Sequence, residues 1–245
     1  MNPLAAGRFR PVSPCGRPVS WAATGRLGGA SRVPFDSLNL SPAVGDDQAT
    51  VQINQQQVAK LIGATELQVL DAKHGAKVAI ASHGGIADAC DGVVTTTPGL
   101  ALLALAADCV PIVLADPAHG VIAAAHCGWR GLTAGIVQAT VTVMREQGAV
   151  NIQAITGPAI CAQCYPVQID CIDQLRDGLP QTHFADVALR IDDQWRVDVR
   201  AGVHLQLADL DVTFSSIQRC TYEDPTLFSY RRDGRTGRHG MIVVQ

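Results

Sequence analysis

The hydrophobic positions of this 245-residue chain form short apolar runs separated by turns that contain glycine or proline. Two runs, Pro111–Ala115 and Val121–Ala125, flank the turn sequence Asp-Pro-Ala-His-Gly and predict a β-hairpin. Helical spacing replaces this pattern over residues 45–63, where Asp46 or Asp47 is the expected N-cap and Gly63 the expected end. Helical spacing of the apolar residues appears again beyond Gly131 and continues to about Gly148, which predicts a second helix. Strands that alternate with helices predict an α/β protein.

Weaker patterns complete the expected secondary structure. Residues 1–18 show no periodicity and predict an irregular N-terminal arm, whereas residues 19–245 contain no break in composition and are expected to form a single domain. A further helix is expected at Arg196–Val212. Further strands are expected at Val19–Ala23, Leu67–Leu70, Lys77–Ser82, Ile152–Ile160, Ser215–Cys220 and the C-terminal end.

Composition agrees with a layered α/β protein that has a substantial core. Hydrophobic residues make up 47% of the chain and charged residues 17%, while aromatic residues account for only 4%. The net charge of −3 gives no basic surface for nucleic acid or for an anionic membrane. We find no apolar run of membrane-spanning length and no secretory signal, and the eight cysteines are spaced irregularly. A reducing cytoplasmic location is therefore the expectation.

The predicted hairpin carries a cysteine and a histidine that could form one site. Antiparallel pairing places Cys109, before the first strand, beside His126, at the end of the second. A thiolate and an imidazole together suit Zn²⁺, with copper as an alternative. A third ligand is needed, and the candidates are His74, His83 and His119.

Two other interpretations of this pair remain open at this point. Cys109 could be a nucleophile activated by His126, with Asp108 or Asp91 orienting the imidazole. Alternatively, both side chains could simply fill the core.

Three further stretches carry candidate chemistry. Gly-Trp-Arg-Gly after His126 opens a predicted helix, so Arg130 and the helix N-terminus could bind an anion or simply form a turn. Cys161 and Cys164 form a Cys-x-x-Cys motif without a second such pair, which argues against structural zinc and leaves a redox pair open. The basic run from Ser229 to Gly240 is either a solvated turn or a loop that closes over an anionic ligand.

Several motifs together resemble the laccase-domain family, now generally regarded as zinc-dependent purine nucleoside phosphorylases. The resemblance covers most of the chain. The matching stretches are GRLGGASRVPFDSLNL, VGDD, the His-Gly at His74, DGVVTTTPG, ADCVPIVLADPAHGVIAAAHCGWRGL, GPAICAQCYPV, CTY and FSYRRDGRTGRHG. The family implies central mixed β-sheets with helices outside, an α/β/β/α-like arrangement. It also implies a catalytic zinc held by His74, Cys109 and His126.

The activity that this resemblance implies is phosphorolysis of adenosine, inosine, guanosine or methylthioadenosine. Deamination of adenosine at the same site is also implied, and a zinc-bound water suits that reaction. The expected partners are thus purine nucleosides and phosphate. Arg130 is a candidate phosphate contact, and Ser37 and Asn39 are candidate substrate contacts.

The chain departs from the usual family pattern at several positions. Ala43 replaces a histidine, and Ala72 with Lys73 replaces a Gln-Val pair. Gln55 replaces an arginine, which predicts a lost phosphate contact worth about 1.5–3 kcal/mol. Cys161 replaces a glycine.

Two rival functions follow from these features. One is a copper-dependent polyphenol oxidase, although a single His/Cys/His set lacks the many histidines of a multicopper relay. The other is a nucleoside-binding relative that kept the zinc and has weak catalysis. No sequence feature predicts the oligomeric state.

Overall fold

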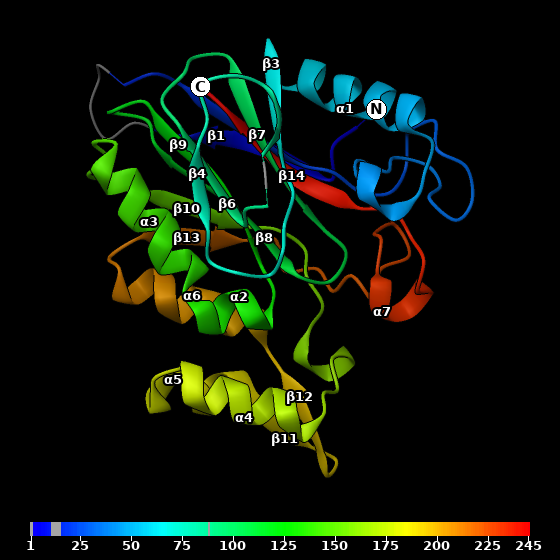
Figure 1. Ribbon diagram of the computed structural model, residues 1–245, viewed down its shortest axis with the longest axis vertical. Helices are drawn as coiled ribbons and strands as arrows, with labels where there is room; N and C mark the ends of the chain where they lie inside the picture. The colour runs from blue at the N-terminus through cyan, green and yellow to red at the C-terminus, as the bar shows by residue number, and fades with distance from the viewer. Residues whose placement is uncertain (1, 11–15, 88) are drawn as a thin grey trace.

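Two six-stranded mixed sheets lie face to face in the computed structural model, which describes residues 2–10, 16–87 and 89–245 (Figure 1). The first sheet runs in the order β1 (Ala5–Phe9), β2 (Val19–Ala23), β14 (His239–Val244), β7 (Leu100–Ala106), β3 (Glu66–Leu70) and β5 (Gly85–Ala87). The second runs in the order β13 (Thr213–Ser216), β10 (Gln153–Thr156), β8 (Val110–Asp116), β9 (Val121–Cys127), β6 (Gly92–Thr95) and β4 (Val78–Ile80).

The sheets bury their facing sides against each other and their outer sides against helices. Small and branched side chains of β7, β8, β9 and β14 form the core between the sheets. Helix α1 (Gln48–Leu61) packs on the outer side of the first sheet. Helices α2 (Trp129–Ala134), α3 (Ile136–Glu146) and α6 (Val199–Asp209) cover the second sheet. This order of layers confirms the predicted α/β/β/α arrangement.

Local signals account for where two of the helices begin and end. The side chain of Asp47 accepts a hydrogen bond from the amide of Thr50 and caps α1, as its position before the helical pattern predicts. The single helix expected after Gly131 is instead two helices. Gly135 adopts a left-handed conformation with φ of 82° and separates α2 from α3.

The structure adds a strand to the segment predicted to be irregular. Residues Ala5–Phe9 of the arm form β1, which pairs with β2 in antiparallel register and so lengthens the first sheet. Its short segment has too few apolar positions to show a period. The rest of that predicted arm includes residues 1 and 11–15, which lie outside the described residues.

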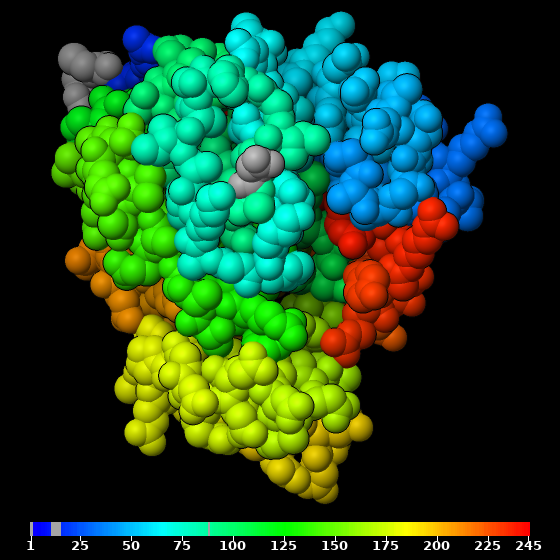
Figure 2. Space-filling view, viewed as in Figure 1, coloured from blue at the N-terminus to red at the C-terminus, as the bar shows by residue number. Residues whose placement is uncertain are grey.

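The hydrophobic pattern did not predict a small helical unit that the structure shows between residues 162 and 197. It contains η2 (Ala162–Cys164), α4 (Ile169–Gly178), α5 (Gln181–Val187) and the hairpin β11 (Ala188–Ile191)–β12 (Gln194–Val197). The helix expected from Arg196 therefore begins only at Val199, because Arg196 and Val197 belong to β12. Coloured yellow, this unit forms the lower end of the molecule in Figure 2, next to α2 in green.

Among the described residues, no helix is long and apolar enough to cross a membrane.

Candidate metal centre

Three segments that are distant in sequence bring His74, Cys109 and His126 together. His126 lies near the end of β9 and pairs with Pro111 of β8, so Cys109, just before β8, is its neighbour across the hairpin. His74 comes from the loop between β3 and β4. One ligand atom from each of the three residues lies within 4.8 Å of the others, and the two imidazole rings meet edge-on with centroids 4.9 Å apart. This geometry agrees with a common metal site for the hairpin pair, and His74 supplies the third donor.

The neighbouring histidines do not reach this cluster. His119 lies in the hairpin turn at the other end of β8 and β9, where its Nδ1 lies 2.8 Å from Asp116. His83 lies in an exposed turn before β5 and is outside the cluster.

The buried carboxylate of Asp91 holds two of the three ligands in position. One of its oxygens accepts a hydrogen bond from the amide of His74 at 2.8 Å and lies 3.4 Å from Nδ1 of His126. The other accepts hydrogen bonds from the amides of Lys73 at 3.2 Å and Gly75 at 2.8 Å. Burial opposes ionisation, but these hydrogen bonds keep the pKa of Asp91 below its usual value. Asp91 therefore fixes both the His74 loop and the His126 ring.

Asp108 positions the third ligand through an unusual backbone conformation. Its φ is 106°, a region that non-glycine residues rarely adopt. Its carboxylate accepts hydrogen bonds from the hydroxyls of Thr221 at 2.6 Å and Ser229 at 2.7 Å and from the amide of Arg231 at 2.6 Å. These contacts offset the backbone strain and present Cys109, the next residue, to the two histidines.

The electrostatics of the cluster favour a thiolate. Burial works against the charged form, but His126 and His74 lower the pKa of Cys109 to about 6. Burial likewise works against a charged His126, and the Cys109 thiolate together with Asp91 raises its pKa to about 9. A thiolate is the form of cysteine that binds metal, and His126 has to release its proton to bind the same ion as a neutral imidazole.

The residues present fit a zinc ion, which would be held by Nε2 or Nδ1 of the two histidines and by the sulfur of Cys109. Catalytic zinc usually has three protein ligands, and histidine and cysteine are among the residues that supply them. Gly128 leaves the space that the cluster needs, because a Cβ at this position would lie 2.9 Å from the Cys109 sulfur and 3.1 Å from the His74 ring.

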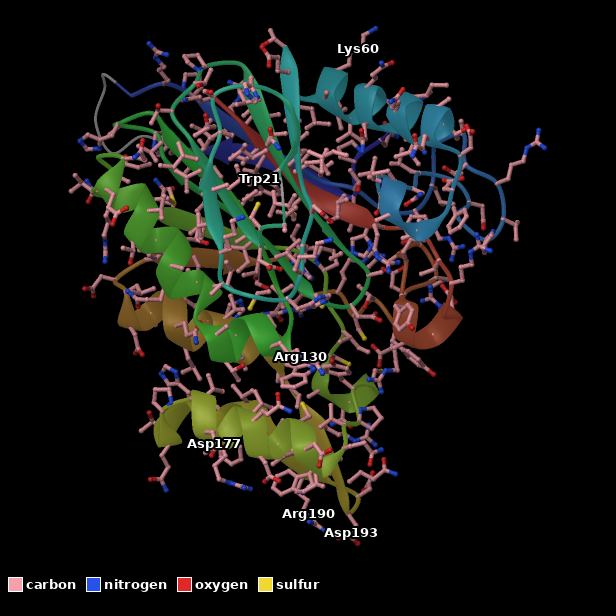
Figure 3. The ribbon with its side chains drawn as sticks, in the orientation of Figure 1. Trp21, Lys60, Arg130, Asp177, Arg190 and Asp193 are labelled. Carbon is pink, nitrogen blue, oxygen red and sulfur yellow. The ribbon has the colours of Figure 1, made fainter. Side chains whose placement is uncertain are left out.

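The cluster opens into a cavity of about 610 Å³. Its other lining residues include three arginines, Arg130, Arg231 and Arg238, and three aromatic residues, Trp129, Tyr165 and Tyr230. Figure 3 shows Arg130 beside α2, on the side that faces the unit formed by α4 and α5. The cavity thus combines metal ligands, positive charge and aromatic surface.

Not all the residues predicted to contact substrate reach this cavity. Arg130 lines it, with its guanidinium 4.2 Å from the ring of Trp129. Ser37 instead accepts hydrogen bonds from the amides of Gly28 and Gly29. Asn39 is fully buried, and its side-chain oxygen accepts a hydrogen bond from the amide of Arg238 at 2.9 Å. Asn39 therefore holds the backbone of a cavity-lining residue without lining the cavity itself.

The cavity gains lining residues that the sequence reasoning did not single out. Tyr165 follows the Cys-x-x-Cys motif, and Arg231 lies over its ring at 4.8 Å. Arg238 belongs to the basic run from Ser229 to Gly240. Tyr230, Arg231 and Arg238 of this run line the cavity, as expected if the run closes over an anionic ligand. Tyr165 lies within the family-matching stretch GPAICAQCYPV, which was the available signal for it.

Three of the departures from the family pattern, at Ala43, Ala72 and Gln55, fall in two places. Ala43 and Ala72 line the cavity, where a smaller side chain enlarges it. Gln55 lies elsewhere, on α1, and donates a hydrogen bond to the carbonyl of Leu40 at 2.8 Å. Gln55 itself is not among the residues that line this cavity.

These features define an α/β/β/α protein with a His–Cys–His centre at the open end of a hairpin. Residues 20–245 match the family described as multi-copper polyphenol oxidoreductase laccase, and the chain belongs to this family.

Similar proteins carry a different functional name. A purine nucleoside phosphorylase of Streptomyces griseus is 43% identical over 89% of this chain and 91% of its own length. One from Streptomyces coelicolor is 44% identical over 88% of this chain and 90% of its own. The crystal structure of the Bacillus licheniformis protein YfiH superposes with a TM-score of 0.85 at 28% identity and covers 92% of both chains.

Proposed function

We propose that this chain is a zinc-dependent purine nucleoside phosphorylase that also deaminates adenosine. The observation that carries the proposal is the single cavity in which His74, Cys109 and His126 meet three arginines and three aromatic rings. Its volume of about 610 Å³ lies within the roughly 300–1,000 Å³ typical of small-molecule sites. The names of the Streptomyces relatives support the same activity.

The cationic residues suit the phosphate co-substrate. Arg130 lines the cavity that contains the metal ligands, and arginine binds phosphate through two parallel hydrogen bonds. Arg238 is partly buried and contributes a second positive charge. Arg231 is held in place by its hydrogen bond to the carbonyl of Pro166 at 2.8 Å.

The aromatic residues suit the purine base. Tyr165 and Tyr230 offer flat apolar surface on which a base can stack. Burial raises the pKa of Tyr165 to about 12, so its hydroxyl remains a hydrogen-bond donor at neutral pH. Phosphorolysis releases the base with negative charge that a donor or a cation must stabilise, and the Tyr165 hydroxyl and the arginines are suited to do this.

A zinc ion held by His74, Cys109 and His126 would supply Lewis-acid chemistry and would make a water molecule more acidic. The protein's own contribution is to hold the three donors. Asp91 orients His126 and the His74 loop, and Asp108 presents Cys109. Deamination needs an activated water at such a site, which is why we include it as a second activity.

The description of the family favours one alternative, a copper-dependent polyphenol oxidase. A multicopper relay needs many histidines at neighbouring sites. Among residues 2–10, 16–87 and 89–245, only two groups bring three or more donor residues within 4.8 Å, and only one of them contains histidine. This count supports the phosphorylase over the oxidase.

A product assay decides between these activities. Zinc-loaded protein is incubated with adenosine, with and without phosphate, and the products are separated by chromatography. Adenine that forms only with phosphate supports phosphorolysis, and inosine supports deamination. Oxygen uptake with a phenol by copper-loaded protein, without any nucleoside product, would replace the proposal with the oxidase. An intact nucleoside that still binds would leave only the binding role.

A further inference from the structure

The Cys-x-x-Cys motif has a partner that the sequence spacing concealed. Cys161 and Cys164 lie at the two ends of η2, after β10. Cys220 and Glu223 lie in the turn after β13, nearly 60 residues later. A parallel bridge between Ala159 and Cys220 joins the two segments, and the amide of Thr221 donates to the carbonyl of Ala159 at 3.2 Å.

The four side chains form a compact set of donors. The sulfurs of the three cysteines and a carboxylate oxygen of Glu223 all lie within 4.8 Å of one another. The set consists of two half-sites with the same spacing, because two residues separate Cys161 from Cys164 and two separate Cys220 from Glu223. Paired half-sites with this spacing are the usual arrangement of tetrahedral structural zinc.

The backbone around the cluster also suits bound thiolates. The amide of Cys161 donates a hydrogen bond to the sulfur of Cys220 at 3.4 Å. Nearby, the guanidinium of Arg200 donates to the carbonyls of Ala159 and Arg219 at 3.0 and 2.9 Å, which places a positive charge beside the two segments. Amide donors and a nearby cation stabilise sulfur ligands in their charged form.

We propose that Cys161, Cys164, Cys220 and Glu223 bind a second, structural zinc ion, separate from the site at His74, Cys109 and His126. Four donors match the tetrahedral coordination of structural zinc. A disulfide would use two of the three sulfurs and leave the third cysteine and the carboxylate without a function.

The second zinc ion would brace the wall of the first site. Two neighbours of the zinc ligands hold Asp108. The amide of Ile160, just before Cys161, donates a hydrogen bond to the carbonyl of Asp108 at 2.9 Å. The hydroxyl of Thr221, just after Cys220, donates one to the Asp108 carboxylate at 2.6 Å. Tyr165, which lines the cavity, follows Cys164 directly. The metal therefore ties together two loops that position Asp108 and Tyr165.

The test is the zinc content of the full-length protein and its variants, measured by plasma mass spectrometry after dialysis. We expect a second zinc ion per chain in the wild type. Cys220→Ser should lose this ion and keep the other, and Cys109→Ala should do the reverse. Glu223→Gln should bind the second ion more weakly, while the exposed Glu146→Gln serves as the matched control.

Cobalt substitution provides a second test that does not require the Cys220→Ser variant to fold, because it leaves the four proposed ligands of the second site unchanged. In the Cys109→Ala protein, the thiolate-to-cobalt absorption should correspond to three thiolates on one cobalt ion. A wild type that binds only one zinc ion, lost in Cys109→Ala, would overturn the proposal. A disulfide among Cys161, Cys164 and Cys220 in the wild type, found by thiol counting and peptide mass, would overturn it in favour of a redox pair. Both readouts are independent of nucleoside turnover.

Discussion

Replacing Asp91 by asparagine should damage both the stability of the protein and its metal affinity. The two side chains have nearly the same shape, so the change removes charge and acceptor capacity rather than volume. One carboxylate oxygen serves the His74 amide and the His126 ring, and the other serves the amides of Lys73 and Gly75. Whichever oxygen becomes the amide nitrogen, two donors lose their acceptor and face another donor.

The structure sets the size of this effect. Hydrogen bonds to a charged group contribute about 1.5–3 kcal/mol each, so losing two destabilises the folded state by about 3 kcal/mol or more. Loss of the partner that orients a metal-binding histidine weakens metal affinity by roughly 10- to 100-fold. The second effect equals about 1.4–2.8 kcal/mol of binding free energy.

Two assays measure these quantities separately. Urea unfolding of the metal-free protein gives the change in the free energy of unfolding, and competition with a chromophoric chelator gives the zinc affinity of the site. Asp177→Asn is the control, because Asp177 is exposed on α4, away from the cavity (Figure 3). If Asp91→Asn unfolds and binds zinc as the control does, Asp91 does not hold the ligands and the reasoning fails.

Three further predictions concern single residues. Gly128→Ala should reduce zinc affinity in a chelator competition, because its Cβ would lie 2.9 Å from the Cys109 sulfur. Arg130→Gln should raise the KM for phosphate more than the KM for nucleoside in steady-state assays, because Arg130 lines the cavity and is charged. Burial lowers the pKa of His239 to about 4, below the usual 6.5. His239 should therefore contribute stability above pH 6.5 that is lost, by up to about 3 kcal/mol, as the pH falls towards 4.

Each of these three predictions can be contradicted by a specific result. Gly148→Ala strains the backbone at a φ of 94° but brings its Cβ within 4 Å of no other atom, so a loss of zinc affinity equal to that of Gly128→Ala would contradict the packing argument. Equal changes in both KM values for Arg130→Gln would argue against a phosphate contact. If His239→Gln keeps the wild-type slope of unfolding free energy between pH 7 and 5, His239 does not cause that slope.

The hairpin and its two ligands were predictable because they depend on local sequence. The apolar runs, the turn between them and antiparallel pairing were enough to place Cys109 beside His126. The order of the layers and the third ligand, His74, came from the resemblance to the family. Neither follows from periodicity, because His74 reaches the site through a loop whose conformation depends on Asp91.

The second cysteine cluster and the cavity lining could not be predicted in this way, because both depend on contacts between segments that are distant in sequence. Cys220 is 56 residues from Cys164 in sequence, and their segments meet only in the folded protein, through the bridge between Ala159 and Cys220 and the hydrogen bonds around it. Tyr165 reaches the cavity through a loop that has no repeating pattern. The break at Gly135 was missed for a different reason, since a single glycine within a helical pattern is often tolerated.

The position of β14 has a consequence for how the protein is made. This strand lies between β2 and β7 in the middle of the first sheet, whereas all strands of the second sheet come from residues 78–216. During synthesis the second sheet, with Cys109 and His126, can assemble before residues 239–244 exist. The first sheet cannot close until β14 is available, and Arg238, which immediately precedes it, completes the cavity wall. A nascent chain therefore acquires its metal ligands before it acquires the cavity into which they open.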